Sequence, residues 1–359
     1  MASNALRRWM PVMVLLLLIA AGIWWARARR PAPEYAMAYV ADPSAIVWNA
    51  NAQVRQPVTT LHYGDRVTIL QRAGDREQVR SDAGVQGWID APTLMDADLW
   101  QQAGQILTRA RTLPVQARGH TRTISNIRLT AGRDGARIFQ FGRNEPVVVL
   151  ERATSPIPQE ASEAASSAAD NVSKMEDWLL VMRAAPALGA SDTGATTAGA
   201  APAVSPAGSA APTAASTVPI AGWVLARFIE LDPPPPLPDY FNAAGIRVVA
   251  WAVLNTVTDN GESHPQYLVA GARGGEGQPC DFTLLRVYTW GAARQRYETA
   301  YIENDICGRM PIRVASTPAG DEFRFADAAD PKVERLYRMK QTSVRRVNET
   351  AAPPRGKKR

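Results

Sequence analysis

The chain has 359 residues and a formal net charge of +6, and this length suits two or three domains better than one. Its basic residues are almost all Arg and are scattered, whereas nucleic-acid-binding proteins usually gather theirs into a patch. Two Cys and three His offer few ligands for a metal site. The totals favour a binding or structural protein over an enzyme, and we expect no cofactor, no metal and no nucleic-acid partner.

The stretch from Trp9 to Ala26 is an unbroken apolar run. At about 1.5 Å per residue it just crosses a hydrocarbon core of about 30 Å, and Trp24 and Trp25 fall where interfacial aromatic residues lie. We therefore predict a single membrane helix within an anchor of residues 1–30. The alternative is a cleaved signal peptide, because Ala26–Ala28 has the A-x-A shape of a cleavage site, although Trp and Arg crowd it.

Short strand and turn signals fill residues 36–95. A Leu-x-x-Gly turn at Leu61–Gly64 leads into an apolar strand at Val67–Leu70, and a second strand follows at Gln78–Arg80. A Gly turn at Asp82–Gly84 then precedes a last strand that begins with Gly-Trp-Ile at Gly87–Ile89. Over Ala38 to Leu94 this pattern resembles the bacterial SH3-like domain family. The Trp that the family usually carries in the second strand is missing here. The resemblance implies a small SH3-like β-barrel.

Apolar residues recur at helical spacing between Leu99 and Ala110. Asp96 or Asp98 is placed to cap the start, and Leu113–Pro114 ends the pattern. We predict one amphipathic helix in a linker of residues 96–122, packed against a neighbouring domain.

A second, degenerate copy of the SH3-like pattern is expected in residues 123–232. It consists of Phe141–Ala153, Trp178–Arg183 and Gly222–Leu231. Pro146 within the first of these segments suggests an edge strand. Two insertions, residues 155–173 and 184–218, are rich in Ala, Ser, Gly, Thr and Pro, and we expect them to be disordered.

A Pro-rich linker, residues 233–239, separates this copy from the C-terminal third. Strand patterns with turn residues between them then continue through residues 240–348. The expected strands are 246–254, 266–272, 282–290, 295–302, 312–315, 322–326, 334–339 and 343–347. They predict an antiparallel β-meander, sandwich-like or similar to propeller blades. Residues 349–359 are expected to be a basic disordered tail. The predicted fold class is thus mostly β: a membrane helix, two SH3-like barrels joined by a helix, and a β-meander domain.

The two cysteines, Cys280 and Cys307, flank a predicted hairpin. In an oxidising compartment we expect them to form a disulfide worth about 3 kcal/mol by loop entropy. In the cytosol they would be two free thiols.

The sequence has no G-x-S-x-G, no H-E-x-x-H and no paired-Cys zinc knuckle. Cys280 precedes a strand and His264 is expected in a turn, so no helix N-terminus lowers the thiol pKa as a cysteine peptidase requires. The Gly-rich stretch Gly271–Gly277 lacks the Gly-Lys-Ser/Thr of a phosphate cradle and is better explained as a hairpin loop. We expect no catalytic residues.

In the SH3-like family, aromatic and polar residues line the ligand groove. The resemblance therefore implies five candidate ligand-binding residues: Tyr39, Trp48, His62, Tyr63 and Trp178. Trp88 and Trp223, in the Gly-Trp segments, are better explained as hydrophobic plugs of the barrels.

The resemblance implies a non-catalytic binding module for peptidoglycan or a protein partner. The Arg residues flanking the apolar run are nearly balanced, but the Cys pair and the SH3-like repeats favour export of the bulk of the chain. We expect a single-pass protein of a bacterial inner membrane. The alternative is an assembly component acting through protein–protein contacts of the C-terminal β domain, and a more remote one is a hydrolase with an unrecognised site.

Overall fold

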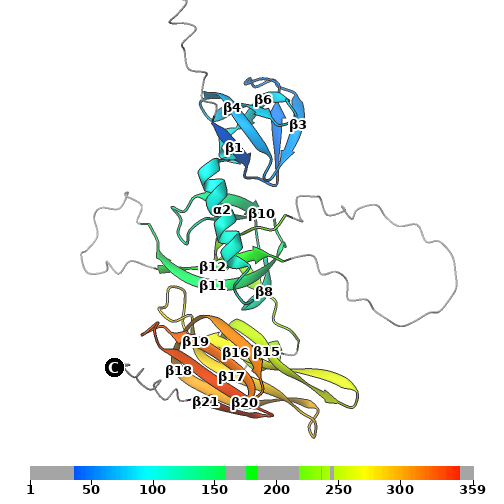
Figure 1. The fold of residues 1–359 in the computed structure, drawn as a ribbon, viewed down its shortest axis with the longest axis vertical. Helices are drawn as coiled ribbons and strands as arrows, with labels where there is room; N and C mark the ends of the chain where they lie inside the picture. Colours follow the sequence, from blue (N-terminus) through cyan, green and yellow to red (C-terminus); the bar gives the residue numbers. More distant parts are fainter. Residues whose placement is uncertain (1–35, 159–174, 185–217, 236, 243–245, 348–359) are drawn as a thin grey trace, which may run out of the picture.

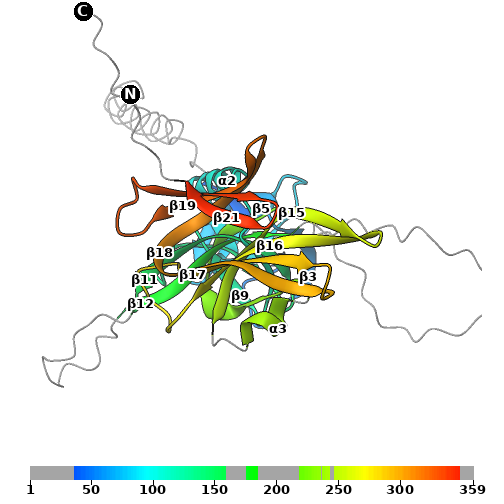
Figure 2. The same ribbon diagram turned by 90° about the horizontal axis from the view of Figure 1, so that it is seen from below.

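A computed structural model describes residues 36–158, 175–184, 218–235, 237–242 and 246–347. The prediction of a mostly β protein is confirmed: the described chain forms three seven-stranded sheets in which every strand pair is antiparallel. The sheets follow one another along the long axis in chain order (Figure 1). Seen from below, the third sheet lies over the other two (Figure 2).

The first sheet has the strand order β3-β2-β6-β5-β4-β1-β7. Its strands are β1 (Met37–Val40), β2 (Ser44–Trp48), β3 (Pro57–His62), β4 (Arg66–Ala73), β5 (Arg76–Ser81), β6 (Gln86–Asp90) and β7 (Leu94–Asp96). Alternate side chains, including Val47, Val67, Val79 and Ile89, turn inward and form one core.

The second sheet repeats this order strand by strand, as β10-β9-β13-β12-β11-β8-β14. Its strands are β8 (Ala117–Thr121), β9 (Ser125–Arg128), β10 (Arg137–Phe141), β11 (Pro146–Pro156), β12 (Met175–Arg183), β13 (Ala221–Leu225) and β14 (Ile229–Leu231). The repeat seen in the sequence therefore has a counterpart in the topology. β11 lies inside the sheet, between β12 and β8, so the expectation of an edge position for Pro146 is wrong. Pro146 is tolerated because it is the first residue of the strand.

A helix stands where the apolar spacing predicts one. It is α2 (Ala97–Ala110), and the Asp96 carboxylate caps its start by accepting a hydrogen bond from the Leu99 N–H at 2.7 Å. Leu99 and Ile106 pack on the core of the second sheet, while Tyr39 of the first sheet stacks on Trp100. The helix thus joins the first two sheets.

The third sheet is an antiparallel meander in which the strands pair in chain order. Its strands are β15 (Arg247–Asp259), β16 (Glu262–Ala272), β17 (Phe282–Gly291), β18 (Arg296–Thr317), β19 (Gly320–Asp327), β20 (Glu334–Lys340) and β21 (Ser343–Val347). One face carries a large core that includes Phe282, Phe323 and Phe325. The short helix α3 (Leu237–Asn242) packs with Tyr267 and Tyr288 in a second cluster.

β18 differs from the expectation of two separate strands. It pairs with β17 as far as Gly308 and with β19 from there onward, with a register shift between Arg309 and Arg313. The polar run from Glu303 to Asp305, which is typical of a loop in the sequence, is held inside this long strand.

Several expectations concern residues outside the described ranges. These are the apolar run from Trp9 to Ala26, the tail 349–359 and most of the two insertions. Ser155 and Pro156, at the start of the first insertion, belong to β11. Within the described part of the chain, no helix is both long and apolar enough to span a membrane.

Candidate functional site

Two of the five candidate aromatic residues lie in the contact between the first sheet and α2. The ring of Tyr39 stacks on Trp100 with a centroid distance of 4.8 Å, and Tyr63 lies 5.5 Å from the same ring. Tyr63 also meets Phe139 of the second sheet edge-on at 4.9 Å. Gly64, with φ +87°, lets the turn approach, because a Cβ there would lie 3.0 Å from Trp100. These rings hold the two sheets together.

The other three candidates are scattered. Trp48 is half-buried, and the Arg55 guanidinium covers its ring at 4.3 Å. His62 is exposed at the end of β3, and Trp178 is 1% exposed in the second sheet. Trp88, beside Trp48 on the neighbouring strand, is half-buried too. The structure therefore does not bring the five residues into one groove.

A cavity lies between the second and third sheets. We call this cavity, of about 730 Å³, the junction cavity. Its volume is within the range of roughly 300–1,000 Å³ typical of ligand sites. Its lining comes from β11 and β12, the chain from Ala226 to Leu231, the helix α3, the start of β15, the loop of Gly274–Glu276, and Met310 of β18.

An ion-pair network that includes an almost fully buried Arg stands at the wall of the junction cavity. Arg152, on β11, donates to Asp177 Oδ1 at 2.6 Å and to Asp281 Oδ1 at 2.8 Å. The three side chains are 4%, 1% and 8% exposed. Burial opposes the charge on Arg152, but the two carboxylates outweigh it and raise the pKa of the guanidinium above its ordinary value. The guanidinium thus stays charged in the interior, whereas burial raises the pKa of the Asp281 carboxyl above its ordinary value although Arg152 acts in the opposite direction.

The loop between β16 and β17 closes over this network. Arg152 donates to the backbone oxygens of Gln278 and Cys280, and the Gly277 N–H donates to Asp177 Oδ1 at 2.8 Å. Gly277 has φ +80°, and a Cβ there would lie 2.6 Å from the Met175 oxygen. This loop is the Gly-rich stretch of the sequence, and its glycine is needed for close approach.

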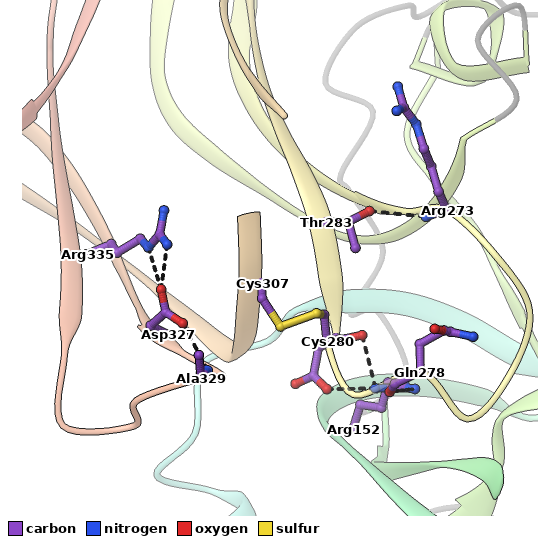
Figure 3. The surroundings of a disulfide bond; sticks show 10 residues. Arg152, Arg273, Gln278, Cys280, Thr283, Cys307, Asp327, Ala329 and Arg335 are labelled. Carbon is purple, nitrogen blue, oxygen red and sulfur yellow. Dashed lines mark hydrogen bonds and ion pairs between the residues drawn. A yellow bond between two sulfur atoms is a disulfide. The ribbon is translucent and has the colours of Figure 1, made fainter. Parts of the chain in front are cut away.

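A disulfide between Cys280 and Cys307 ties the end of that loop to β18. Figure 3 shows the bond beside Arg152 and Gln278. On the other side, Met310 N–H donates to Asp281 Oδ2 at 2.8 Å. The loop that forms one wall of the junction cavity is therefore fixed both covalently and by hydrogen bonds.

Two groups on the cavity wall have unused hydrogen-bonding capacity. Asp177 Oδ2 is buried and has no hydrogen-bond partner. Arg247 forms an ion pair with this oxygen, with its Nη2 4.0 Å away and its side chain 48% exposed. Further charged side chains of the lining form exposed ion pairs with each other: Arg122 with Glu230 at 3.3 Å, and Arg227 with Glu276 at 3.5 Å.

The described residues of the lining include no Cys, Ser, Thr, His or Lys, and its carboxylates are those of Asp177, Glu230 and Glu276. Among the described residues, no cluster of His, Cys, Asp and Glu could hold a metal ion. Sequence reasoning missed this site because Arg152, Asp177 and Asp281 are far apart in the chain. The only local signal is Glu176–Asp177 directly before an apolar strand.

Comparison with known proteins assigns no family. No protein-family model and no curated protein matches the chain. The solved structure of NlpC1 from Trichomonas vaginalis is similar at 11% identity and a TM-score of 0.17, over 57% of this chain and 49% of that one. NlpC2 from the same organism is similar at 9% identity and a TM-score of 0.17, over 83% and 94%. The chain thus spans about half the length of NlpC1, and scores this low carry no argument about fold or activity.

Proposed function

We propose that the protein is a non-catalytic binding protein that holds a segment of a protein partner in the junction cavity. The observation that carries this proposal is a mostly apolar hollow lined by a buried carboxylate oxygen that has no hydrogen bond and by the half-exposed guanidinium that pairs with it at 4.0 Å. Concave, mostly apolar sites with a few polar groups are the usual form of a binding site. The Glu230 and Glu276 carboxylates of the lining are paired with Arg122 and Arg227, which suits binding better than nucleophilic attack.

The rest of the fold supports a scaffold role. The second and third sheets are joined by Arg152 and by Gln116, which bonds both backbone groups of Ile312. The first sheet is joined to the second by Trp100 and by the pair of Arg137 with Asp42. A rigid column of three sheets would hold the junction cavity at a fixed distance from the first sheet.

The cellular setting is part of the same proposal. The apolar run from Trp9 to Ala26 would anchor the chain in a bacterial inner membrane, with the sheets on the extracytoplasmic side. The Cys280–Cys307 disulfide supports an oxidising compartment. The first two sheets would be the SH3-like modules that the sequence resembles, and their repeated topology supports that assignment.

Crosslinking in the native host tests the proposal. A photo-crosslinking amino acid replaces Gly275, which lines the cavity and has nothing within 4 Å of a Cβ position. The matched control is Gly104, on the exposed face of α2 with the same free space. We expect a discrete crosslinked protein from position 275 and none from position 104.

The captured protein is then purified, and its affinity is measured for full-length wild type, Gly275→Trp and Gly104→Trp. An indole at Gly275 should fill the cavity mouth and weaken binding at least tenfold, while Gly104→Trp should bind as wild type. Equal affinity for all three would refute the proposal. Saturable pelleting with peptidoglycan sacculi that Gly275→Trp abolishes, without a protein crosslink, would replace the protein partner by the cell wall.

A further inference from the structure

We infer that the junction cavity recognises the main chain of an extended partner segment: Asp177 Oδ2 accepts from a peptide N–H, and Arg247 donates to a peptide C=O. This inference rests on the proposed function and names the chemistry of the occupant. Its basis is the juxtaposition, across the junction cavity, of a carboxylate oxygen without a hydrogen bond on the second sheet and a half-exposed guanidinium on the third.

Asp177 supplies the acceptor. Its Oδ1 is fully used, because Arg152 and the Gly277 N–H both donate to it. Its Oδ2 is buried without a hydrogen bond. Leaving such an atom unpaired costs about 1–3 kcal/mol, more for a charged group, so a donor arriving with a ligand would be strongly favoured.

Arg247 supplies the donor. It is the first residue of β15, on the opposite sheet from Asp177, and its guanidinium is half-exposed at the cavity. Its one ion pair is the 4.0 Å contact with Asp177 Oδ2, which is beyond hydrogen-bonding distance. Its N–H groups can therefore turn to an acceptor on a ligand without breaking a close pair.

The closeness of the two groups selects for a neutral ligand group. A lone cation that approaches Asp177 is repelled by Arg247, and a lone anion that approaches Arg247 is repelled by Asp177, since each pair would lie within about 4 Å. An extended peptide avoids both penalties, because the N–H and C=O of one residue are uncharged, point to the same side of the strand and are complementary to the two groups. The other Arg–Glu pairs at the cavity are already matched and add little preference for charge.

The remaining lining indicates what the segment carries beside its main chain. Val149, Leu179, Ile229 and Val248 present apolar surface next to Asp177 and Arg247. Apolar side chains of the guest would be buried there at roughly 25 cal/mol per Å². The occupant is therefore an extended, uncharged and apolar stretch of protein rather than a basic or acidic motif.

Selected peptides provide the probe. A random heptapeptide display library is selected against the full-length protein, and binders that Gly275→Trp abolishes are synthesised. Each peptide N–H is replaced in turn by N-methyl, and each amide by an ester, which weakens the carbonyl acceptor. We expect one N-methyl position to lower affinity at least tenfold, and the ester at that amide to do the same because it also lacks the N–H. The sensitive ester that reports on the carbonyl is a second position, at the amide whose C=O accepts from Arg247, and it should also lower affinity at least tenfold.

Arg247→Met should lower the affinity of the unmodified peptide by a similar factor and remove the effect of the sensitive ester. Arg118→Met, at an exposed Arg on β8 that does not line the cavity, is the matched control and should bind as wild type. Both variants keep an apolar stem of similar length, so packing is held constant.

The inference is overturned if both scans are flat and Arg247→Met binds normally. It is also overturned if affinity follows a single Lys, Arg, Asp or Glu of the peptide. Either result leaves the proposed function standing, because the peptides still occupy the cavity. If the library yields no binder that Gly275→Trp abolishes, the proposed function and the inference fail together, and the crosslinking result then tells whether a folded partner takes the cavity instead.

Discussion

At the scale of single residues, Gln116 is the clearest case of one side chain joining two sheets. It is 2% exposed, its Nε2 donates to the Ile312 oxygen at 3.1 Å, and its Oε1 accepts from the Ile312 N–H at 2.7 Å. Its own backbone oxygen accepts from the Trp251 N–H. The amide thus imitates a strand in bonding both groups of one residue, which no apolar side chain could do.

Replacing this amide should therefore be costly. Gln116→Ala leaves both backbone groups of Ile312 buried and unpaired, and we expect a loss of about 2–4 kcal/mol in the opening free energy of this contact. Hydrogen exchange at the Ile312 amide measures it directly. Gln101→Ala, on the exposed side of α2, is the control. Unchanged exchange at Ile312 would contradict the bridging role.

Tyr63 gives a pH-dependent prediction. Burial raises the pKa of its phenol to about 12, although the charge of Arg183 acts in the opposite direction. The folded protein should keep this phenol protonated between its unfolded pKa of about 10 and 12, so the stability that it contributes falls as pH rises through that window. Absorbance at 295 nm for wild type minus Tyr63→Phe should therefore titrate near 12 in the folded state. In denaturant the same difference should titrate near 10. A folded-state midpoint near 10 would contradict the buried position.

The sequence predicts single residues unevenly. Leu99 and Ile106 follow a periodicity that alone determines a helical face, so the helix could be predicted. Tyr39 and Tyr63 could not be told apart from groove residues, since a ring that binds a ligand and one that binds a helix have the same local pattern. The network of Arg152 was beyond reach, because its partners come from strands that only the tertiary fold brings together.

At the scale of elements, the loop between β16 and β17 matters most. It supplies Gly277 and the oxygens of Gln278 and Cys280 to the network, and its end is fixed to β18 by the disulfide. From the sequence it was expected to be an ordinary hairpin loop. Strand periodicity locates such a loop but contains no information on what it packs against.

Removing the disulfide tests how far this loop depends on it. The two cysteines are 27 residues apart, and in the loop-entropy model such a link contributes about 3–4 kcal/mol. Cys280→Ala/Cys307→Ala should lower the thermal midpoint of the third sheet and speed hydrogen exchange at the Gly277 amide. Wild type after treatment with a dithiol should behave like the variant. If Gly277 exchanges no faster in either sample, the loop is held by Arg152 and Asp281 alone.

At the scale of the whole molecule, the three sheets form a column, and the indole of Trp100 is central to the contact between the first sheet and the second. Trp100 is in contact with Tyr39 and Tyr63 of the first sheet and stands on the helix that packs on the second. Arg137 adds a pair with Asp42 and a bond to the Pro92 oxygen. We expect the first sheet to keep a fixed orientation in the wild-type protein.

Trp100→Ala should loosen the contact between the first two sheets, because it removes both ring contacts and leaves a void worth about 3–5 kcal/mol. Single-molecule energy transfer between dyes on unnatural amino acids at Val54 and Lys332, both exposed, should change from a narrow to a broad distribution. Asp96→Ala, which removes only the helix cap, should cost about 1 kcal/mol and leave the distribution narrow. A narrow distribution for Trp100→Ala would show that Arg137 and the contact of Tyr63 with Phe139 suffice.

The placement of β12 has a consequence for the order of events during synthesis. This strand pairs with β11 before it and β13 after it, yet residues 157–174 and 184–220 separate it from them in the chain. Non-local pairings of this kind slow folding, since loop closure must come before the contacts that reward it. The second sheet cannot be completed on the ribosome until β13 and β14 emerge, and Asp177 of β12 cannot engage Gly277 until the loop that carries it follows. The nascent chain should therefore expose unfinished sheet edges for longer than an uninterrupted repeat would, which is the stage at which chaperone dependence and misassembly are expected.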